Sequence, residues 1–159
     1  MYKKIAAVSA ALLVAASFSA PAFAHVSPAP TTVSLDGFLN LSQTLNINCA
    51  ASLTLTINAD GHTGSITGGS IDPGDWQCAL VNPSNFPWAV TIGHADANGD
   101  APVTISGLSS TSIAGDCSGN VSGTISSPGV IVLDDTIPGV PGPCHISGAL
   151  VSSSSLTVS

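Results

Sequence analysis

Basic side chains are almost missing from this chain of 159 residues. The only two, Lys3 and Lys4, stand at its start, and no Lys or Arg follows them. Glu is also absent and all nine acidic residues are aspartates, so residues 25–159 carry a formal charge of 0 − 9 = −9 with His neutral. A chain without cationic side chains cannot neutralise phosphates. The composition therefore excludes nucleic acids and anionic membrane surfaces as partners.

A long apolar run occurs only once, over residues 5–18, directly after the two lysines. The run is too short and too rich in alanine to favour a membrane span, and an A-x-A motif follows it at residues 22–24. These features together are typical of a secretory signal peptide. We expect residues 1–24 to be removed on export, leaving His25 as the new terminus; an uncleaved anchor is the alternative. The expected location is extracellular or the cell surface, with the periplasm as the alternative.

Four cysteines follow the predicted signal peptide. An even number of cysteines in an exported protein indicates disulfides, and three connectivities are open. The one we favour divides the chain into two similar loops, Cys49–Cys78 and Cys117–Cys144, each of which would stabilise the fold by about 3–4 kcal/mol. Metal binding by thiolates is disfavoured, because no two of the cysteines have C-x-x-C spacing.

Good helix formers are scarce and Ser, Thr and Gly are abundant, a mixture that favours strands and turns. Over residues 39–57, apolar side chains occupy mainly the odd positions and Asn, Ser or Thr mainly the even ones, which is the period of a half-buried strand. This stretch is too long for one strand, so we expect two, broken or bent near residues 48–51. Further strands are expected at 63–67, 86–94, 102–106, 120–126, 130–134, 144–151 and 155–158.

Many short strands separated by turns predict a single disulfide-stapled, all-β domain, either an antiparallel β-sandwich or a barrel-like fold. We expect this β-domain over residues 39–159, with residues 25–38 as an extended N-terminal arm. Apolar extended segments lie near both ends, at 33–41 and 149–158, and no Lys protects a sheet edge. Such a segment can complete the sheet of a neighbour. A homo-oligomer or polymer is therefore one expectation, and pairing within the same domain is the other.

Asp96, Asn98 and Asp100 place side-chain oxygens at alternate positions, as at the start of a calcium loop. The EF-hand pattern then fails, because Ala101 stands where Gly is needed and Gly107 where Glu is needed. A plain hairpin tip is favoured, since Asn-Gly is a strong hairpin signal. The three oxygen-bearing residues are kept as a candidate surface Ca²⁺ site, and no other cofactor is expected from this segment.

Catalytic motifs are missing from the sequence. It contains no nucleophile elbow, zinc-protease motif or phosphate-binding loop, and most aspartates stand beside Gly, Pro or Asn, where they cap turns. We therefore expect no enzyme. Copper is the alternative, because cleavage before His25 would place an amine and an imidazole on one residue; a second ligand would come from His62, His94 or His145.

The most distinctive segment of the sequence is CALVNPSNFPW, over residues 78–88, in which a cysteine precedes a strand that opens with Phe, Pro and Trp. This segment and CHISGAL at 144–150, with the Ser-rich tail, resemble the alkane-oxidation activator proteins of the PraB type. The length, the signal, the paired cysteines and the scarcity of basic residues agree with that family. The resemblance supports disulfides at all four cysteines and implies a small secreted protein that promotes growth on, or access to, hydrocarbons. It implies no catalytic residues.

Aromatic side chains are few after the signal, and Trp76, Phe86 and Trp88 are the candidate binding surface. The competing interpretation places Phe86 and Trp88 in the core, because they share the parity of Val90 and Ile92. The expected function is a secreted, non-enzymatic surface, biofilm-matrix or hydrocarbon-interface protein that contacts hydrocarbon or a cell surface. The alternatives are a pilin-like fibre subunit or adhesin, and an exported copper-binding protein.

Overall fold

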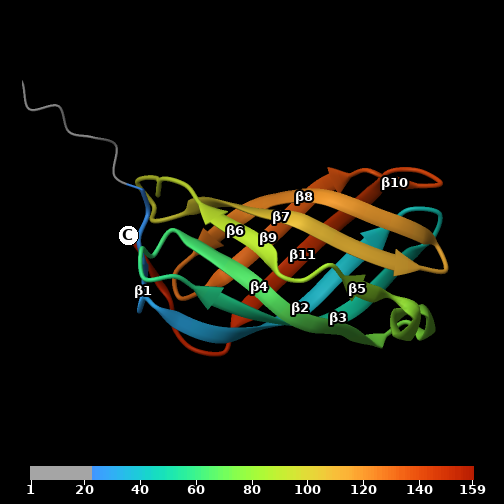
Figure 1. The fold of residues 1–159 in the computed structure, drawn as a ribbon, viewed down its shortest axis with the longest axis horizontal. Helices are drawn as coiled ribbons and strands as arrows, with labels where there is room; N and C mark the ends of the chain where they lie inside the picture. The colour runs from blue at the N-terminus through green and yellow to red at the C-terminus, as the bar shows by residue number, and fades with distance from the viewer. Residues whose placement is uncertain (1–22) are drawn as a thin grey trace, which may run out of the picture.

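The computed structural model of the protein describes residues 23–159, so the predicted signal peptide lies outside the described residues except for its last two. The described chain is almost entirely β-structure (Figure 1), and its one helical element is a 3₁₀ turn, η1 (Trp76–Leu80). The long strands are β2 (Thr31–Ser42), β3 (Asn46–Ile57), β4 (Thr63–Gly74), β7 (Ala101–Ser112), β8 (Gly115–Ser126), β9 (Val130–Ile137) and β11 (Cys144–Ser152). The short strands are β1 (Val26–Ser27), β5 (Asn82–Ser84), β6 (Trp88–Ile92), β10 (Gly139–Val140) and β12 (Thr157–Val158).

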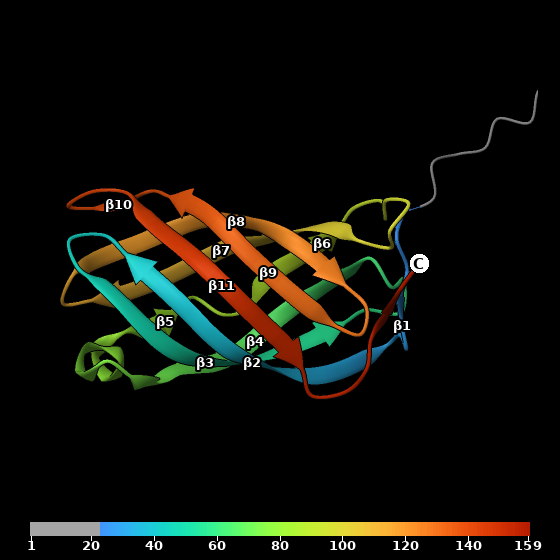
Figure 2. The ribbon, with the colours of Figure 1, turned by 180° about the vertical axis from the view of Figure 1, so that it is seen from behind.

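Eight strands close into an antiparallel barrel (Figures 1 and 2). The order of hydrogen-bonded neighbours is β8, β9, β11, β2, β3, β4, β6 and β7, and β7 pairs back with β8. Strand β5 adds to β7 and β10 adds to β8, while β1 and β12 pair as a separate ribbon next to the C-terminus. The predicted all-β fold is therefore confirmed, in its barrel-like form.

The barrel interior is filled by the alternating side chains that the sequence predicted. In β3 every odd position from Ile47 to Ile57 is buried, and the even positions carry mainly polar side chains. The break within residues 39–57 is not at 48–51, however, but at residues 43–45, between β2 and β3. Odd positions point inward in both strands, so the alternation runs through the turn without a change of parity. At 48–51 the structure has only an irregular register against β4, between Cys49 and Ala51.

The expected boundary between an arm and a β-domain at residue 38 lies inside β2. This strand pairs with β3 along its whole length and with β11 from Leu35 to Ser42. Only the short β1 precedes it, and β1 pairs with β12. The two apolar end segments thus pair within the chain, because closure of the barrel brings β2 and β11 side by side.

The barrel is tightly paired at one end and splayed at the other. Strands β4 and β6 pair over four residues, 63–66 with 88–91, and β8 and β9 pair over four residues, 123–126 with 130–133. Both pairings lie towards the end that carries β1, β12 and the C-terminus, here called the terminal end (Figure 1). Towards the opposite end β4 and β6 diverge, leaving a gap beside η1 and β5, whereas the ladder between β8 and β9 is only interrupted and resumes where β10 pairs with β8. We call this opposite end the mouth end.

Candidate binding cavity and the loops at its mouth

Both disulfides lie at the mouth end of the barrel. Cys49 of β3 is bonded to Cys78 of η1, with the Cα atoms 5.5 Å apart, and this bond holds η1 beside the gap between β4 and β6. Cys117 of β8 is bonded to Cys144 of β11, with the Cα atoms 6.0 Å apart, and this bond joins the two strands that flank β9. These are the two pairings favoured from the sequence, and residues 23–159 contain no free cysteine.

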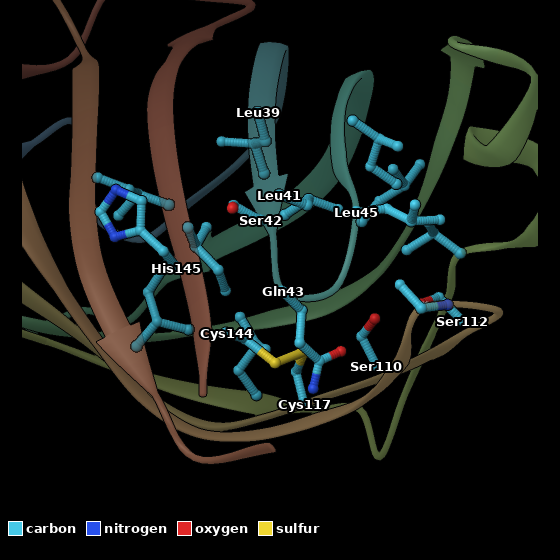
Figure 3. A pocket seen from close by; sticks show the side chains of 18 of the residues that line it. Leu39, Leu41, Ser42, Gln43, Leu45, Ser110, Ser112, Cys117, Cys144 and His145 are labelled. Carbon is cyan, nitrogen blue, oxygen red and sulfur yellow. A yellow bond between two sulfur atoms is a disulfide. The ribbon is translucent and has the colours of Figure 1, made fainter. Parts of the chain in front are cut away.

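Because the strands diverge at the mouth end, the core there is incompletely filled and encloses a cavity (Figure 3). The cavity has a volume of about 60 Å³, whereas one water molecule needs roughly 10–15 Å³ on the same measure. Its wall is mainly aliphatic and includes Leu39, Leu53, Ile105 and Leu133, with the buried indole of Trp88. Eight-stranded barrels either fill their interior or hold one small ligand, and this cavity leaves part of the interior unfilled.

Polar groups in the lining gather in or beside the loops that connect the strands at the mouth end. Gln43, in the β2–β3 loop, donates from Nε2 to the carbonyl oxygen of Gly142 at 2.7 Å. Thr44, in the same loop, donates from Oγ1 to the carbonyl oxygen of Ala114 at 3.0 Å. The β2–β3 loop is thereby tied to the β10–β11 loop and to the β7–β8 turn. Among the described residues, the Oε1 atom of Gln43 is buried without a hydrogen-bond partner.

Large apolar side chains are exposed on the elements of this same end. Their exposed fractions run from 42% for Leu45 to 73% for Trp76. We call these five the tip residues: Leu45 in the β2–β3 loop, Ile113 in the β7–β8 turn, Val140 in β10, and Trp76 and Leu80 in η1. Both views show these four elements gathered at one end of the barrel (Figures 1 and 2). Turn positions normally carry Gly, Pro, Asn, Asp or Ser, so apolar side chains at several tips of one end are unusual.

The turns of the terminal end consist mainly of the residue types that are usual in turns. Residues 58–62 read Asn, Ala, Asp, Gly and His; residues 95–100 read Ala, Asp, Ala, Asn, Gly and Asp; and residues 127–129 read Ser, Pro and Gly. Two of the exposed large apolar side chains in residues 23–159 adjoin these turns: Phe23, within the predicted signal peptide, and Val151, which pairs with Val130 directly after the turn at 127–129. The turns of the terminal end are therefore more polar than those of the mouth end, while Phe38, Val132 and Val151 are exposed on the barrel wall.

The three aromatic residues predicted as one surface do not lie together on the outside. Trp88 is 2% exposed, lines the cavity and donates from its indole N–H to the carbonyl oxygen of Ser84 at 2.8 Å. Phe86 is half-buried and stacks on Trp88, with ring centroids 4.4 Å apart. Only Trp76 is exposed. The core interpretation therefore holds for Trp88, because the parity it shares with Val90 points it into the barrel.

The candidate calcium residues form a hairpin tip between β6 and β7. The Oδ1 atom of Asp96 accepts the backbone N–H groups of Asn98 and Asp100 at 2.8 and 3.0 Å. These two bonds, that of Asp100 first, lower the pKa of the Asp96 carboxyl. Among residues 23–159, no group of three or more His, Cys, Asp or Glu side chains is placed to hold a metal ion.

The histidines of the copper hypothesis are divided between the two ends. His25, His62 and His94 lie at the terminal end, where the ring of Phe23 is 5.5 Å from that of His62 and 4.6 Å from that of His94. The backbone N–H of His25 donates to the carbonyl oxygen of Ser159 at 2.7 Å. His145 lines the cavity instead, and its Nε2 lies 3.4 Å from the carboxylate of Asp134.

Sequence reasoning named Trp76 but missed the other four tip residues and Gln43. A signal for one of these was present, since Ile113 is a large apolar residue in the Ser- and Gly-rich segment between the strands expected at 102–106 and 120–126. For Gln43 the sequence offered no signal, because its partner Gly142 is distant in the chain and meets it only when the barrel closes.

The fold and the cavity define a class of protein: a small, disulfide-closed β-barrel with an apolar cavity at one end. Within residues 23–159 no helix is long and apolar enough to cross a membrane. The chain belongs to the family of alkane oxidation protein activators described as PraA/PraB-like, whose family model matches residues 1–159. No curated protein and no solved structure shows significant similarity to it.

Proposed function

We propose that this protein is a secreted, non-enzymatic hydrocarbon-interface protein that supports alkane oxidation by binding to the hydrocarbon surface with its mouth end. The observation that carries the proposal is the contrast between the two ends of the barrel. At the mouth end, the tip residues expose large apolar side chains, and at the terminal end the turns are polar. Clustered exposed apolar surface marks an interaction site, and membership of the alkane oxidation activator family suggests hydrocarbon as the partner.

Charge favours a neutral apolar surface over an anionic one. Residues 23–159 contain no Lys or Arg to attract lipid phosphates. An uncharged alkane surface does not repel a chain of formal charge −9, and it takes up the tip residues through the hydrophobic effect alone. The two disulfides agree with an oxidising, extracytoplasmic location.

In this proposal the protein gives oxidising enzymes access to hydrocarbon and does not itself catalyse a reaction. The lining of the cavity includes no acid–base pair or activated nucleophile: its only titratable side chain is that of His145. A protein bound at the surface can assist oxidation by making hydrocarbon available to the enzymes that oxidise it.

The test is adsorption of the secreted protein at an n-hexadecane–water interface, followed by pendant-drop tension and by co-flotation with droplets. The tip variant is Leu45→Ser, Ile113→Ser and Val140→Ser. The control variant, Phe38→Ser, Val132→Ser and Val151→Ser, removes three side chains of similar exposure from β2, β9 and β11 on the barrel wall.

At about 1 kcal/mol for each half-exposed side chain transferred to oil, the tip variant should partition to the interface roughly 100-fold less. The control variant should behave as the natural protein. The proposal is overturned if the natural protein does not adsorb, or if the control variant loses as much adsorption as the tip variant. Circular dichroism establishes that both variants are folded.

A further inference from the structure

We propose that the cavity is a binding site for a short, neutral primary alcohol chain, with the amide oxygen of Gln43 accepting the hydrogen bond of the hydroxyl group. This inference deepens the proposed function, on which it rests, by naming the chemical class that enters the barrel at the hydrocarbon surface. A primary alcohol is an alkane chain that carries one oxygen at its end.

The walls of the cavity fit an alkyl chain. The lining side chains beyond the mouth are aliphatic or aromatic, and the deepest of them, among them Leu53, Ile105 and Leu133, are almost fully buried. The space corresponds to several water-sized groups in volume. A short unbranched chain can therefore occupy this space without displacing a polar group.

The amide of Gln43 is fixed in one orientation. Its Nε2 donates to the carbonyl oxygen of Gly142, and only the nitrogen of the amide can donate to a carbonyl. The Oε1 atom therefore has to be the acceptor that remains, and it is buried without a donor. Figure 3 shows this amide among the lining side chains, next to the Cys117–Cys144 disulfide and facing the side of Ser110.

A buried acceptor without a donor is unfavourable, whereas the same acceptor paired with a ligand hydroxyl is not. Oε1 is covered by its neighbours, among them the β7–β8 turn at Gly115, where a Cβ atom would lie 2.6 Å from Oε1. The proposal therefore includes a movement of this glycine turn that exposes Oε1 to the hydroxyl.

The same surroundings disfavour the two closest chemical relatives of the alcohol. A carboxylate would meet no cation, because residues 23–159 lack Lys and Arg and the lining His145 is already beside Asp134. An alkane fills the walls equally well but leaves Oε1 unpaired. Neutral charge and a terminal donor together select the alcohol.

The experiment compares probes of matched size by isothermal titration calorimetry on the secreted protein: 1-hexanol, its isomer 1-methoxypentane, n-heptane and hexanoate. The ether lacks only the donor. We expect 1-hexanol to bind at least about tenfold more tightly than the ether or the alkane, and hexanoate to bind most weakly. Equal binding of the alcohol and the ether overturns recognition of the hydroxyl by Gln43. No binding of any probe overturns the cavity as a ligand site.

Two variants locate the effect. Gln43→Met keeps the length of the side chain without its acceptor, so it should remove the preference for 1-hexanol over the ether while the ether still binds. Thr44→Val removes the other tie of the same loop and should keep the preference; if it does not, the loop and not the acceptor is responsible. Because the comparison with the ether uses the natural sequence, it decides the proposal even where Gln43→Met does not fold.

Failure here is separable from failure of the proposed function. A protein that adsorbs to hexadecane through the tip residues and binds no probe in solution retains the proposed function and loses this inference. A protein that binds 1-hexanol in solution and does not adsorb shows the reverse.

Discussion

One disulfide holds η1 beside the splayed strands β4 and β6 and the other joins β8 to β11, so removing them one at a time tests what each contributes. The two variants are Cys49→Ala with Cys78→Ala and Cys117→Ala with Cys144→Ala. In both cases the bonded residues lie at the mouth end, and three of the four are almost completely buried. The sequence separations are 29 and 27 residues.

The magnitude follows from the length of the loops. Closing a loop of this length in the unfolded chain costs about 3.5 kcal/mol at 25 °C, and the two loops differ by less than about 0.1 kcal/mol. If restriction of the unfolded chain is the whole effect, both variants should lose the same stability. Their positions in the folded state differ, however: one bond holds a peripheral 3₁₀ turn and the other joins two barrel strands.

The assay is equilibrium urea unfolding of the natural protein and of both variants, with the slope of the transition compared as well as its midpoint. We expect two losses of about 3–4 kcal/mol that agree within about 1 kcal/mol. A loss below about 1 kcal/mol in either variant would refute the loop argument for that bond. A much larger loss for the Cys117–Cys144 pair would show that it holds the native barrel closed.

Two further predictions concern single residues. Gly37→Ala should destabilise the barrel by about 1–3 kcal/mol in urea unfolding, because its Cβ would lie 2.0 Å from the carbonyl oxygen of Ala149. The control, Gly68→Ala, has no atom within 4 Å of its Cβ and should be neutral or slightly stabilising. Equal effects of the two substitutions on stability would contradict the packing argument. Hydrogen bonds from the Thr63 side chain and backbone, then the His62 backbone, lower the pKa of Asp60 to about 2. Because this folded-state pKa lies below the unfolded value of about 3.9, Asp60 stabilises the protein above pH 4, and this contribution is lost as the pH falls towards 2. The midpoint of urea unfolding should therefore fall between pH 4 and pH 2. The fall should be smaller in Asp60→Asn, which lacks the titrating carboxyl.

Local patterns in the sequence were sufficient for the fold class. The alternation in residues 46–57 predicted which side chains of β3 are buried, because a strand places neighbours on opposite faces whatever it pairs with. The hairpin at Asn98-Gly99 was predictable for the same reason: its conformation depends on the residues of the turn itself. Even here the pattern did not reveal the turn at 43–45, because the odd positions point into the barrel both before and after it.

The site was less predictable, because its residues come together only by closure of the barrel. Gln43 meets Gly142, which lies 99 residues further along the chain, and the loops bearing Leu45 and Ile113 are joined by the bond from Thr44 to Ala114. Trp88 was expected either at the surface or in the core, and its place in the cavity wall depends on which strands diverge around it. No local pattern contains that information.

By itself, then, the sequence determined the charge, the cysteine content, the strand periodicity and the membership of a family of alkane oxidation activators, because these are properties of composition and of neighbours in the chain. The tertiary structure decided that the sheet closes into a barrel and that β4 and β6 separate towards one end. It also decided that five exposed apolar side chains gather at that end. The physical reason is that strand pairing between distant segments fixes where the core is left unfilled and which turns meet, and this pairing is settled only when the whole chain packs.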